Sequence, residues 1–185
     1  FGYNSFHCDV TGLLNADGKN NVLAVRLENR PQSSRWYPGA GLYRNVRLVT
    51  TERVHVPVWG TQLTTPHVSA EYASVRLRTT IRNAGDADVR ISTDIIAPDG
   101  KIVARKDNSR KINHGQPFEQ NFLINAPSLW SPETPYLYKA VSKIYVDGKQ
   151  TDEYTTRFGI RSIEIIADKG FFLNGKHRKF QGVCN

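Results

Sequence analysis

Hydrophobic and polar residues alternate along most of this 185-residue chain, and nowhere do they follow the spacing of a helix. A period of two places apolar side chains on one face of a β-strand and polar side chains on the other. Turn-forming residues, among them those at 83–86 and 98–100, separate seven such segments between positions 52 and 160. The predicted strands are 54–59, 73–83, 89–96, 102–106, 118–124, 136–146 and 150–160.

Seven short strands of this kind predict an immunoglobulin-like β-sandwich, within a chain that is all-β. Asp147 and Gly148 favour a tight hairpin between the last two strands, because both residue types tolerate a positive φ. Pro57 has no N–H to donate, so the first strand is expected at a sheet edge. The core should be lined by the apolar members of the alternating strands. These are Val75, Leu77, Ile81, Ile91, Phe122, Tyr138, Ile144 and Val146.

Both flanks of this stretch also read as β-structure. Before position 52 the segments 6–10, 21–29 and 45–48 are strand-like, but they are too few to bury a core and predict the tail of a larger β-sandwich. After position 160, Ile163 and Ile165 alternate with Glu164, and the Asn-Gly pair at 174–175 predicts a hairpin. The chain has no methionine and opens within a strand-like segment, so we expect it to be a piece of a longer protein.

The loop before the predicted strand 45–48 combines polar side chains with aromatic ones. It runs Gln-Ser-Ser-Arg-Trp-Tyr over residues 32–37 and is followed by Pro38, Gly39 and Gly41. A sugar ring offers hydroxyl groups in fixed directions and a patch of C–H surface, so it suits a few convergent polar groups beside an aromatic wall. The composition of the loop therefore indicates a ligand-binding site. The alternative is that Trp36 and Tyr37 pack the loop onto a domain interface.

Three segments resemble, in the required order, glycoside hydrolase family 2, which includes bacterial β-galactosidases and β-glucuronidases. They are residues 35–48, residues 129–138, and residues 158–164 followed by 170–176. The resemblance implies three parts. Residues 1–51 would be the C-terminal part of a jelly-roll sugar-binding domain, 52–160 an immunoglobulin-like sandwich, and 161–185 a β-hairpin with the first strand of a truncated (β/α)8 catalytic barrel.

The resemblance also implies an activity, namely retaining hydrolysis of terminal non-reducing β-D-galactose residues. A β-glucuronidase or a β-mannosidase of the same family is the alternative, and an acidic substrate would suit Arg35. A rival of a different class is a non-catalytic carbohydrate-binding or adhesion β-sandwich, which the strand pattern alone equally permits.

Candidate site residues follow from the same resemblance. The implied substrate contacts are Ser34, Arg35 and Trp36 in the loop, and Asn185 at the mouth of the barrel. No catalytic residue is expected in the chain, because the family's two catalytic glutamates lie beyond Asn185, so the fragment itself should be inactive. The strand glutamates are expected to be solvated or edge carboxylates, and Glu133 is expected to be structural. The strand glutamates are Glu28, Glu119, Glu153 and Glu164.

The charge and the motifs of the chain narrow the classes of partner and cofactor that it could bind. The net charge is +8, but the basic residues are scattered without a run of five, which argues against nucleic acid as a partner. The two cysteines, Cys8 and Cys184, and the histidines lack metal-ligand spacing, so no metal site is predicted. No nucleotide-binding motif occurs, so no organic cofactor is predicted either. The sequence has no stretch of 18 apolar residues and no basic segment followed by an apolar run, so neither a membrane span nor a signal peptide is predicted in it. A bacterial periplasm or cytoplasm and an oligomer both stay open, and a β-galactoside or related carbohydrate is the expected partner.

Overall fold

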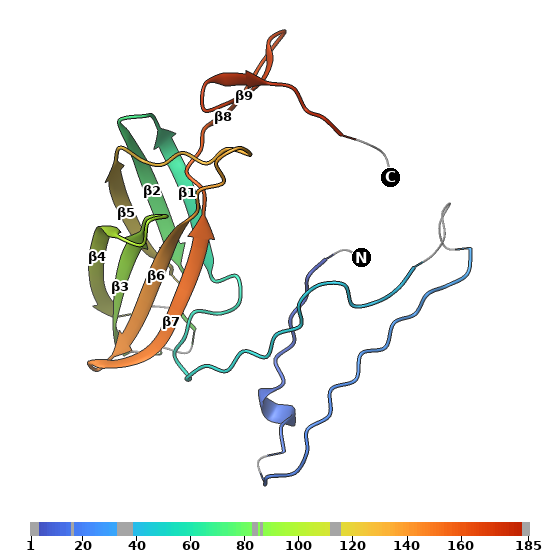
Figure 1. The fold of residues 1–185 in the computed structure, drawn as a ribbon. Coiled ribbons are helices and arrows are strands. Elements are labelled where there is room, and N and C mark those ends of the chain that lie inside the picture. Colours follow the sequence, from blue (N-terminus) through green and yellow to red (C-terminus); the bar gives the residue numbers. More distant parts are fainter. Residues whose placement is uncertain are drawn as a thin grey trace. The chain divides into compact units, whose positions relative to one another are not determined.

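The computed structural model describes residues 4–15, 17–32, 39–82, 85, 87–111 and 116–182. The chain forms two compact units, Phe1–Val49 and Thr50–Asn185. Figure 1 shows the strands gathered in the second of these units.

The second unit is built around a sandwich of two antiparallel sheets (Figure 1). One sheet has the order β1-β2-β5 and the other the order β4-β3-β6-β7. The strands are β1 (Thr61–Val68), β2 (Tyr72–Thr79), β3 (Asp88–Ile96), β4 (Ile102–Lys111), β5 (Phe118–Asn125), β6 (Tyr138–Val146) and β7 (Lys149–Phe158). This all-β arrangement of three and four strands confirms the predicted fold class.

The alternating strands fill the sandwich as their pattern predicts. In β2 and β5 every second side chain is buried, and the same holds over most of β3 and β6. Seven of the eight predicted core residues are buried, and the eighth, Val146, is partly buried against the same core. Phe122 and Leu77 from one sheet pack with Ile95 and Tyr138 from the other, so the two sheets share one apolar interior.

The first predicted strand is wrong, and the sequence pattern missed the true one. Val56 is buried and His55 makes an isolated bridge to Arg82, but a turn follows, in which the Gly60 N–H donates to the Pro57 carbonyl at 2.8 Å. Trp59 has a φ of 59°, which no strand accommodates. The edge strand is instead β1, where polar threonines and Pro66 hide the alternation.

The predicted turns between strands agree with the structure where it describes them. Asp147 and Gly148 have φ values of 49° and 81°, and Asn174 and Gly175 have 51° and 72°, as type I′ hairpins require. At the turn after β3, the Gly100 N–H donates to the Ala97 carbonyl at 2.9 Å. Of the expected turn at 83–86, only Gly85 lies within the described residues.

A buried polar network crosses the sandwich between its two sheets. Gln120 on β5 is fully buried and accepts a hydrogen bond from the Thr93 hydroxyl at 2.6 Å. Its amide nitrogen donates to the Lys106 carbonyl at 3.2 Å and to Asn108 Oδ1 at 3.1 Å. The Thr93 hydroxyl also lies 2.9 Å from that of Ser142. One glutamine therefore ties β5 to strands β3 and β4 of the opposite sheet.

The sandwich is followed by a small antiparallel sheet, which we call the hairpin module (residues 162–178; Figure 1). It consists of β8 (Ile163–Ile166), β9 (Gly170–Leu173) and β10 (Lys176–Arg178), with β9 in the middle. The expected hairpin is confirmed. A strand running on from Arg178 was also expected, but β10 ends at Arg178, and residues 179–182 pair with no strand.

The first unit lacks the strands expected at 6–10, 21–29 and 45–48. Its described residues contain only the short 3₁₀ helix η1 (Thr11–Leu13). A strand is stable only when a neighbour takes up its backbone hydrogen bonds, and alternation alone cannot supply that neighbour. Leu23 is accordingly 73% exposed and Val22 90% exposed.

Candidate functional site

The predicted substrate contacts lie outside the described residues. Ser34, Arg35 and Trp36 fall within the segment 33–38, and Asn185 falls within the segment 183–185. The four substrate contacts therefore stay predictions, and the described residues show the flanks of both segments.

The flank of the loop is aromatic and exposed. After the segment 33–38, Tyr43 is 63% exposed, and the Arg44 guanidinium lies 5.1 Å from the centre of its ring. Leu42 beside it is also exposed. Such a pairing of an aromatic ring with a cation is weak at an exposed site. The flank therefore offers an aromatic face that the core does not use.

The flank of Asn185 is the hairpin module, and a tryptophan joins that module to the sandwich. The Trp130 N–H donates to the Ile160 carbonyl at 2.8 Å, and the Arg161 guanidinium lies 4.6 Å from the centre of the indole. A Cβ at Gly159 would lie 2.9 Å from Trp130 Cβ and Cγ, so only glycine fits there. The chain thus leaves the sandwich at Gly159 pressed against the indole.

Asn174, in the β9–β10 turn, completes this junction. Its side-chain oxygen accepts from the Ser162 N–H at 3.0 Å, and its side-chain nitrogen donates to the Trp130 carbonyl at 3.0 Å. Its own N–H donates to the Ser162 carbonyl at 3.0 Å. The sequence marked Asn174 only as a turn residue, because nothing in an Asn-Gly pair shows what the amide will bind.

An ion pair holds the last strand of the module. Arg178 on β10 donates to both carboxylate oxygens of Glu133, at 2.6 Å and 2.8 Å. The hydrogen bonds from Arg178 lower the pKa of Glu133 to about 2. A lowered carboxyl pKa means that the pair is intact above the usual carboxyl pKa and is lost as the pH falls towards 2. This contact fits the structural role expected for Glu133.

The strand glutamates also lie at the surface, beside cations. Glu119 on β5 lies 3.6 Å from Arg76 and 3.9 Å from Arg78, and Glu153 on β7 lies 3.8 Å from Lys143. Exposed pairs of this kind contribute little to stability. Glu164 is exposed on β8, whereas Glu28, expected in a strand, is exposed in a segment without strands. These positions fit solvated carboxylates.

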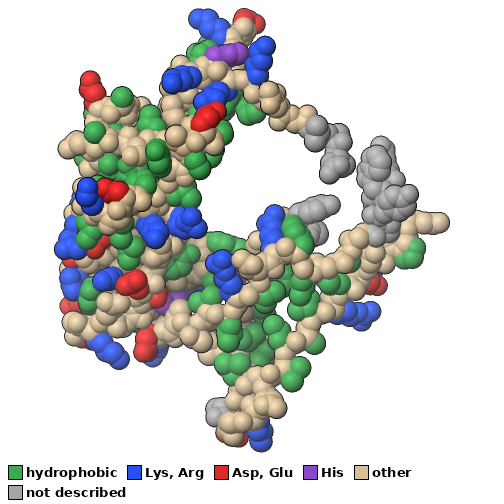
Figure 2. Space-filling model, viewed as in Figure 1, with side chains coloured by type: hydrophobic (Ala, Val, Ile, Leu, Met, Phe, Trp, Pro, Cys, Tyr) green, Lys and Arg blue, Asp and Glu red, His purple; other side chains and the backbone are tan. Residues whose placement is uncertain are grey.

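The histidines and the charged surface point to no further chemistry. His67 stacks on Tyr72 with ring centres 4.4 Å apart, and His177 meets the edge of Phe172. Among the described residues no three His, Cys, Asp or Glu side chains gather to hold a metal ion. Figure 2 shows basic and acidic side chains interspersed over the visible face of the sandwich. No helix within the described ranges is long and apolar enough to cross a membrane.

Comparisons with known proteins give the family. The model of glycosyl hydrolases family 2 matches residues 56–161. The chain is 41% identical to beta-galactosidase BoGH2A of Bacteroides ovatus, over 100% of this chain and 22% of that protein. It is 31% identical to a beta-glucuronidase of Bacteroides fragilis, over 99% of this chain and 28% of that protein.

A solved structure agrees. The crystal structure of a β-glycosidase from Bacteroides vulgatus matches with a TM-score of 0.71 and 30% identity, over 82% of this chain and 19% of that one. The all-β sandwich is thus a module found in glycosidases. The chain belongs to glycosyl hydrolases family 2. It spans between 19% and 28% of the length of these relatives.

Proposed function

We propose that this chain is part of a retaining glycoside hydrolase that cleaves terminal non-reducing β-D-galactose residues. The observation that carries the proposal is the 41% identity, over the whole chain, to a protein named as a β-galactosidase. Because the chain covers only 22% of that relative, we assign the activity to a longer protein that contains it.

The reaction needs two carboxyl groups about 5 to 5.5 Å apart, one as general acid and base and one as nucleophile. Two glutamates described on the sandwich are instead tied to cations, Glu133 to Arg178 and Glu119 to Arg76 and Arg78. We therefore assign this chain a supporting role, in which Ser34, Arg35, Trp36 and Asn185 contact the sugar. Both catalytic glutamates are assigned to the part of the longer protein that lies outside this chain.

A β-glucuronidase is the second candidate. Its support is the 31% identity to a protein named as a β-glucuronidase, and Arg35 would pair with the carboxylate of a glucuronide. A β-mannosidase has only the family to support it. A non-catalytic binding or adhesion module is disfavoured, because the matches to glycosidases extend beyond the sandwich over both flanks of the chain.

A substrate panel tests the proposal. The full-length protein is incubated with the aryl β-galactoside, β-glucuronide and β-mannoside, and the 185-residue chain is tested beside it. We expect the highest kcat/KM for the galactoside and no turnover by the chain alone, because the acid and the nucleophile must stand together on one frame.

Each contrary result has a distinct meaning. A higher kcat/KM for the glucuronide would replace the proposed substrate but keep the enzyme class. Turnover by the chain alone, absent from a mock preparation, would show that the catalytic residues lie within it. No turnover of any of the three by the full-length protein would contradict the glycosidase assignment.

Trp36 provides a test of the loop. We expect Trp36→Ala in the full-length protein to lower kcat/KM on the aryl galactoside about tenfold, as the loss of one well-placed contact does, and to leave the melting temperature nearly unchanged. Trp59→Ala is the control, because Trp59 is 60% exposed and lies outside the loop. Unchanged kinetics together with a lowered melting temperature would show that Trp36 packs the loop instead.

A further inference from the structure

The hairpin module depends on the sandwich for its orientation. Three strands of three or four residues cannot form a core of their own, and Leu173 is the one residue on them that is buried in the described structure. Ile165 is 83% exposed and Ile163 is 52% exposed. Few apolar contacts are therefore available to hold the module, and its polar contacts to residues 130–133 gain importance.

Those polar contacts fall at both ends of β10. Just before its start, the turn residue Asn174 donates to the Trp130 carbonyl at 3.0 Å. At its end, Arg178 bonds to both carboxylate oxygens of Glu133. A single attachment would leave the strand free to pivot, whereas two separated attachments fix its direction. The bidentate geometry of the arginine adds directional constraint to the second one.

The attachments converge on one short segment of the sandwich. Trp130 and Glu133 lie on the connection between β5 and β6, which is itself stiffened because the Ser131 and Thr134 backbones bond to each other at 3.0 and 3.1 Å. The Ser131 hydroxyl also accepts from the Thr134 N–H at 3.1 Å. A stiff segment thus carries both attachments.

We propose that Asn174 and the Glu133–Arg178 pair form a clamp that positions β10, and the chain that continues from it, for the glycosidase reaction. These are positioning residues that touch no reacting atom. The inference rests on the proposed function, since it assigns the clamp to that reaction.

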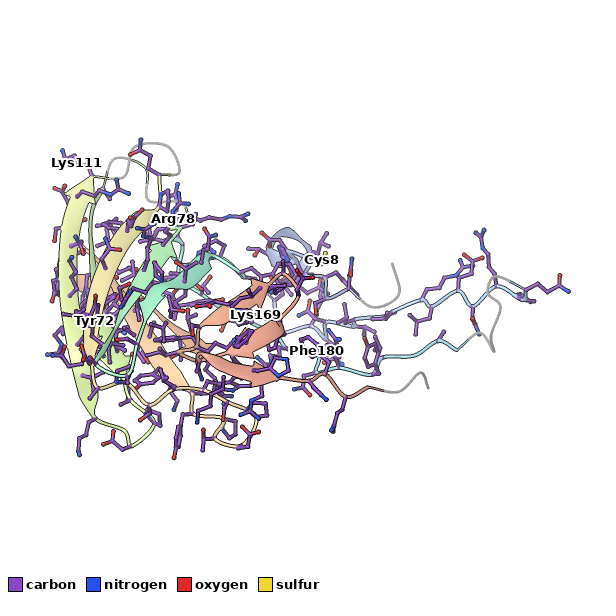
Figure 3. The ribbon with its side chains drawn as sticks, turned by 90° about the horizontal axis from the view of Figure 1, so that it is seen from above. Cys8, Tyr72, Arg78, Lys111, Lys169 and Phe180 are labelled. Atoms are coloured by element: carbon purple, nitrogen blue, oxygen red, sulfur yellow. The ribbon has the colours of Figure 1, made fainter. Side chains whose placement is uncertain are left out.

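The connection from the clamp to the site is short. Residues 179–182 follow β10 directly, and they include Phe180, which Figure 3 labels. The Phe180 ring packs on Phe171 of β9 with ring centres 4.6 Å apart. The substrate-contact candidate Asn185 lies seven positions after Arg178, a reach of at most about 25 Å. A displacement of about 1 Å can lower a catalysed rate by as much as about 100-fold, so a shift of β10 should be visible in turnover.

The variants remove the ion pair, rebuild it with reversed charges, or remove the Asn174 amide. Glu133→Gln removes the ion pair, and Glu133→Arg combined with Arg178→Glu rebuilds it in reverse. Asn174→Gly removes the amide but keeps a residue that accepts the φ of 51°. Lys176→Gln is the matched control, because it removes an exposed charge from the same strand without altering the clamp.

Turnover and backbone protection are measured on the full-length protein. We expect Glu133→Gln and Asn174→Gly to lower kcat about tenfold, with KM on the aryl galactoside changed less than about twofold, because positioning acts on the transition state more than on binding. The reversed pair should recover most of the loss, and Lys176→Gln should match the wild type. Amide hydrogen exchange over residues 162–182 should be faster in the two single variants.

The outcomes distinguish the clamp from the function. Wild-type kcat in both single variants, with an active wild-type enzyme, overturns the positioning role. A loss of kcat that the reversed pair does not recover overturns the ion pair as its cause. If the wild-type protein hydrolyses none of the three glycosides, the proposed function fails together with the positioning role. Amide hydrogen exchange then tests whether the clamp holds β10. Unchanged exchange over residues 162–182 in the two single variants overturns the clamp.

Discussion

Phe122→Ala is expected to lower the free energy of unfolding by about 3 to 5 kcal/mol, the range seen when a buried phenylalanine is truncated. Phe122 is 5% exposed and lies opposite Val75 in the pairing of β5 with β2. It packs in the same cluster as Tyr138 and Phe158 from the other sheet, so its removal leaves a cavity between the sheets. Urea unfolding of the 185-residue chain measures the change.

The neighbouring residue on the same strand gives the control. Leu123 is 58% exposed, because successive side chains point to opposite faces of the sheet. Leu123→Ala should therefore change the free energy of unfolding by no more than about 0.5 kcal/mol. Equal losses from the two substitutions would contradict the register of β5.

Gln120→Ala is expected to lower the free energy of unfolding by about 2 to 4 kcal/mol. The substitution leaves the Thr93 hydroxyl, the Lys106 carbonyl and Asn108 Oδ1 each without one of their hydrogen-bond partners. A buried polar group left unpaired costs about 1 to 3 kcal/mol, and Gln120 is fully buried. Urea unfolding again provides the measurement, with Asn121→Ala on the exposed face of β5 as the control.

A double-mutant cycle shows whether the network acts as a unit. Thr93→Val removes the hydroxyl that Gln120 accepts from, and its effect should overlap with that of Gln120→Ala by about 0.5 to 3 kcal/mol. Losses that simply add would mean that the two side chains contribute independently, despite the 2.6 Å between them.

The alternation of apolar and polar residues predicted the sandwich well. Burial of one face of a strand itself requires an apolar residue at every second position. Ile91 and Ile144 were expected to be buried and are fully so. The polar network was beyond the pattern. Gln120 and Thr93 occupy inward positions, but a pattern of apolar residues counts them as interruptions, and only the opposing sheet shows what they bind.

The edge strand and the first unit show where the pattern fails. In β1 no side chain is fully buried, so the apolar signal that marks a strand is weak. The residues at 54–59 carry that signal, yet the turn around Pro57 directs them away from a ladder. In the first unit the alternation is clear, but a strand also requires a partner, which no local pattern contains.

The candidate site was predictable only through resemblance. The loop composition around Trp36 indicated a ligand but named none, and Asn185 carries no local signal at all. The sequence showed the residue types of the clamp, but it did not show which of these residues bind one another. Glu133 and Arg178 are 45 positions apart, so their pairing follows from the return of the hairpin module to the sandwich.

The irregularity of β1 has a consequence for the protein in concentrated solution. A free sheet edge presents a row of unpaired N–H and C=O groups on which another chain can add a strand and begin aggregation. In β1, Pro66 has no N–H to offer, and the register shifts between Thr64 and His67 break the regular row. The edge that hid this strand from the sequence pattern is thereby a poor template for intermolecular pairing.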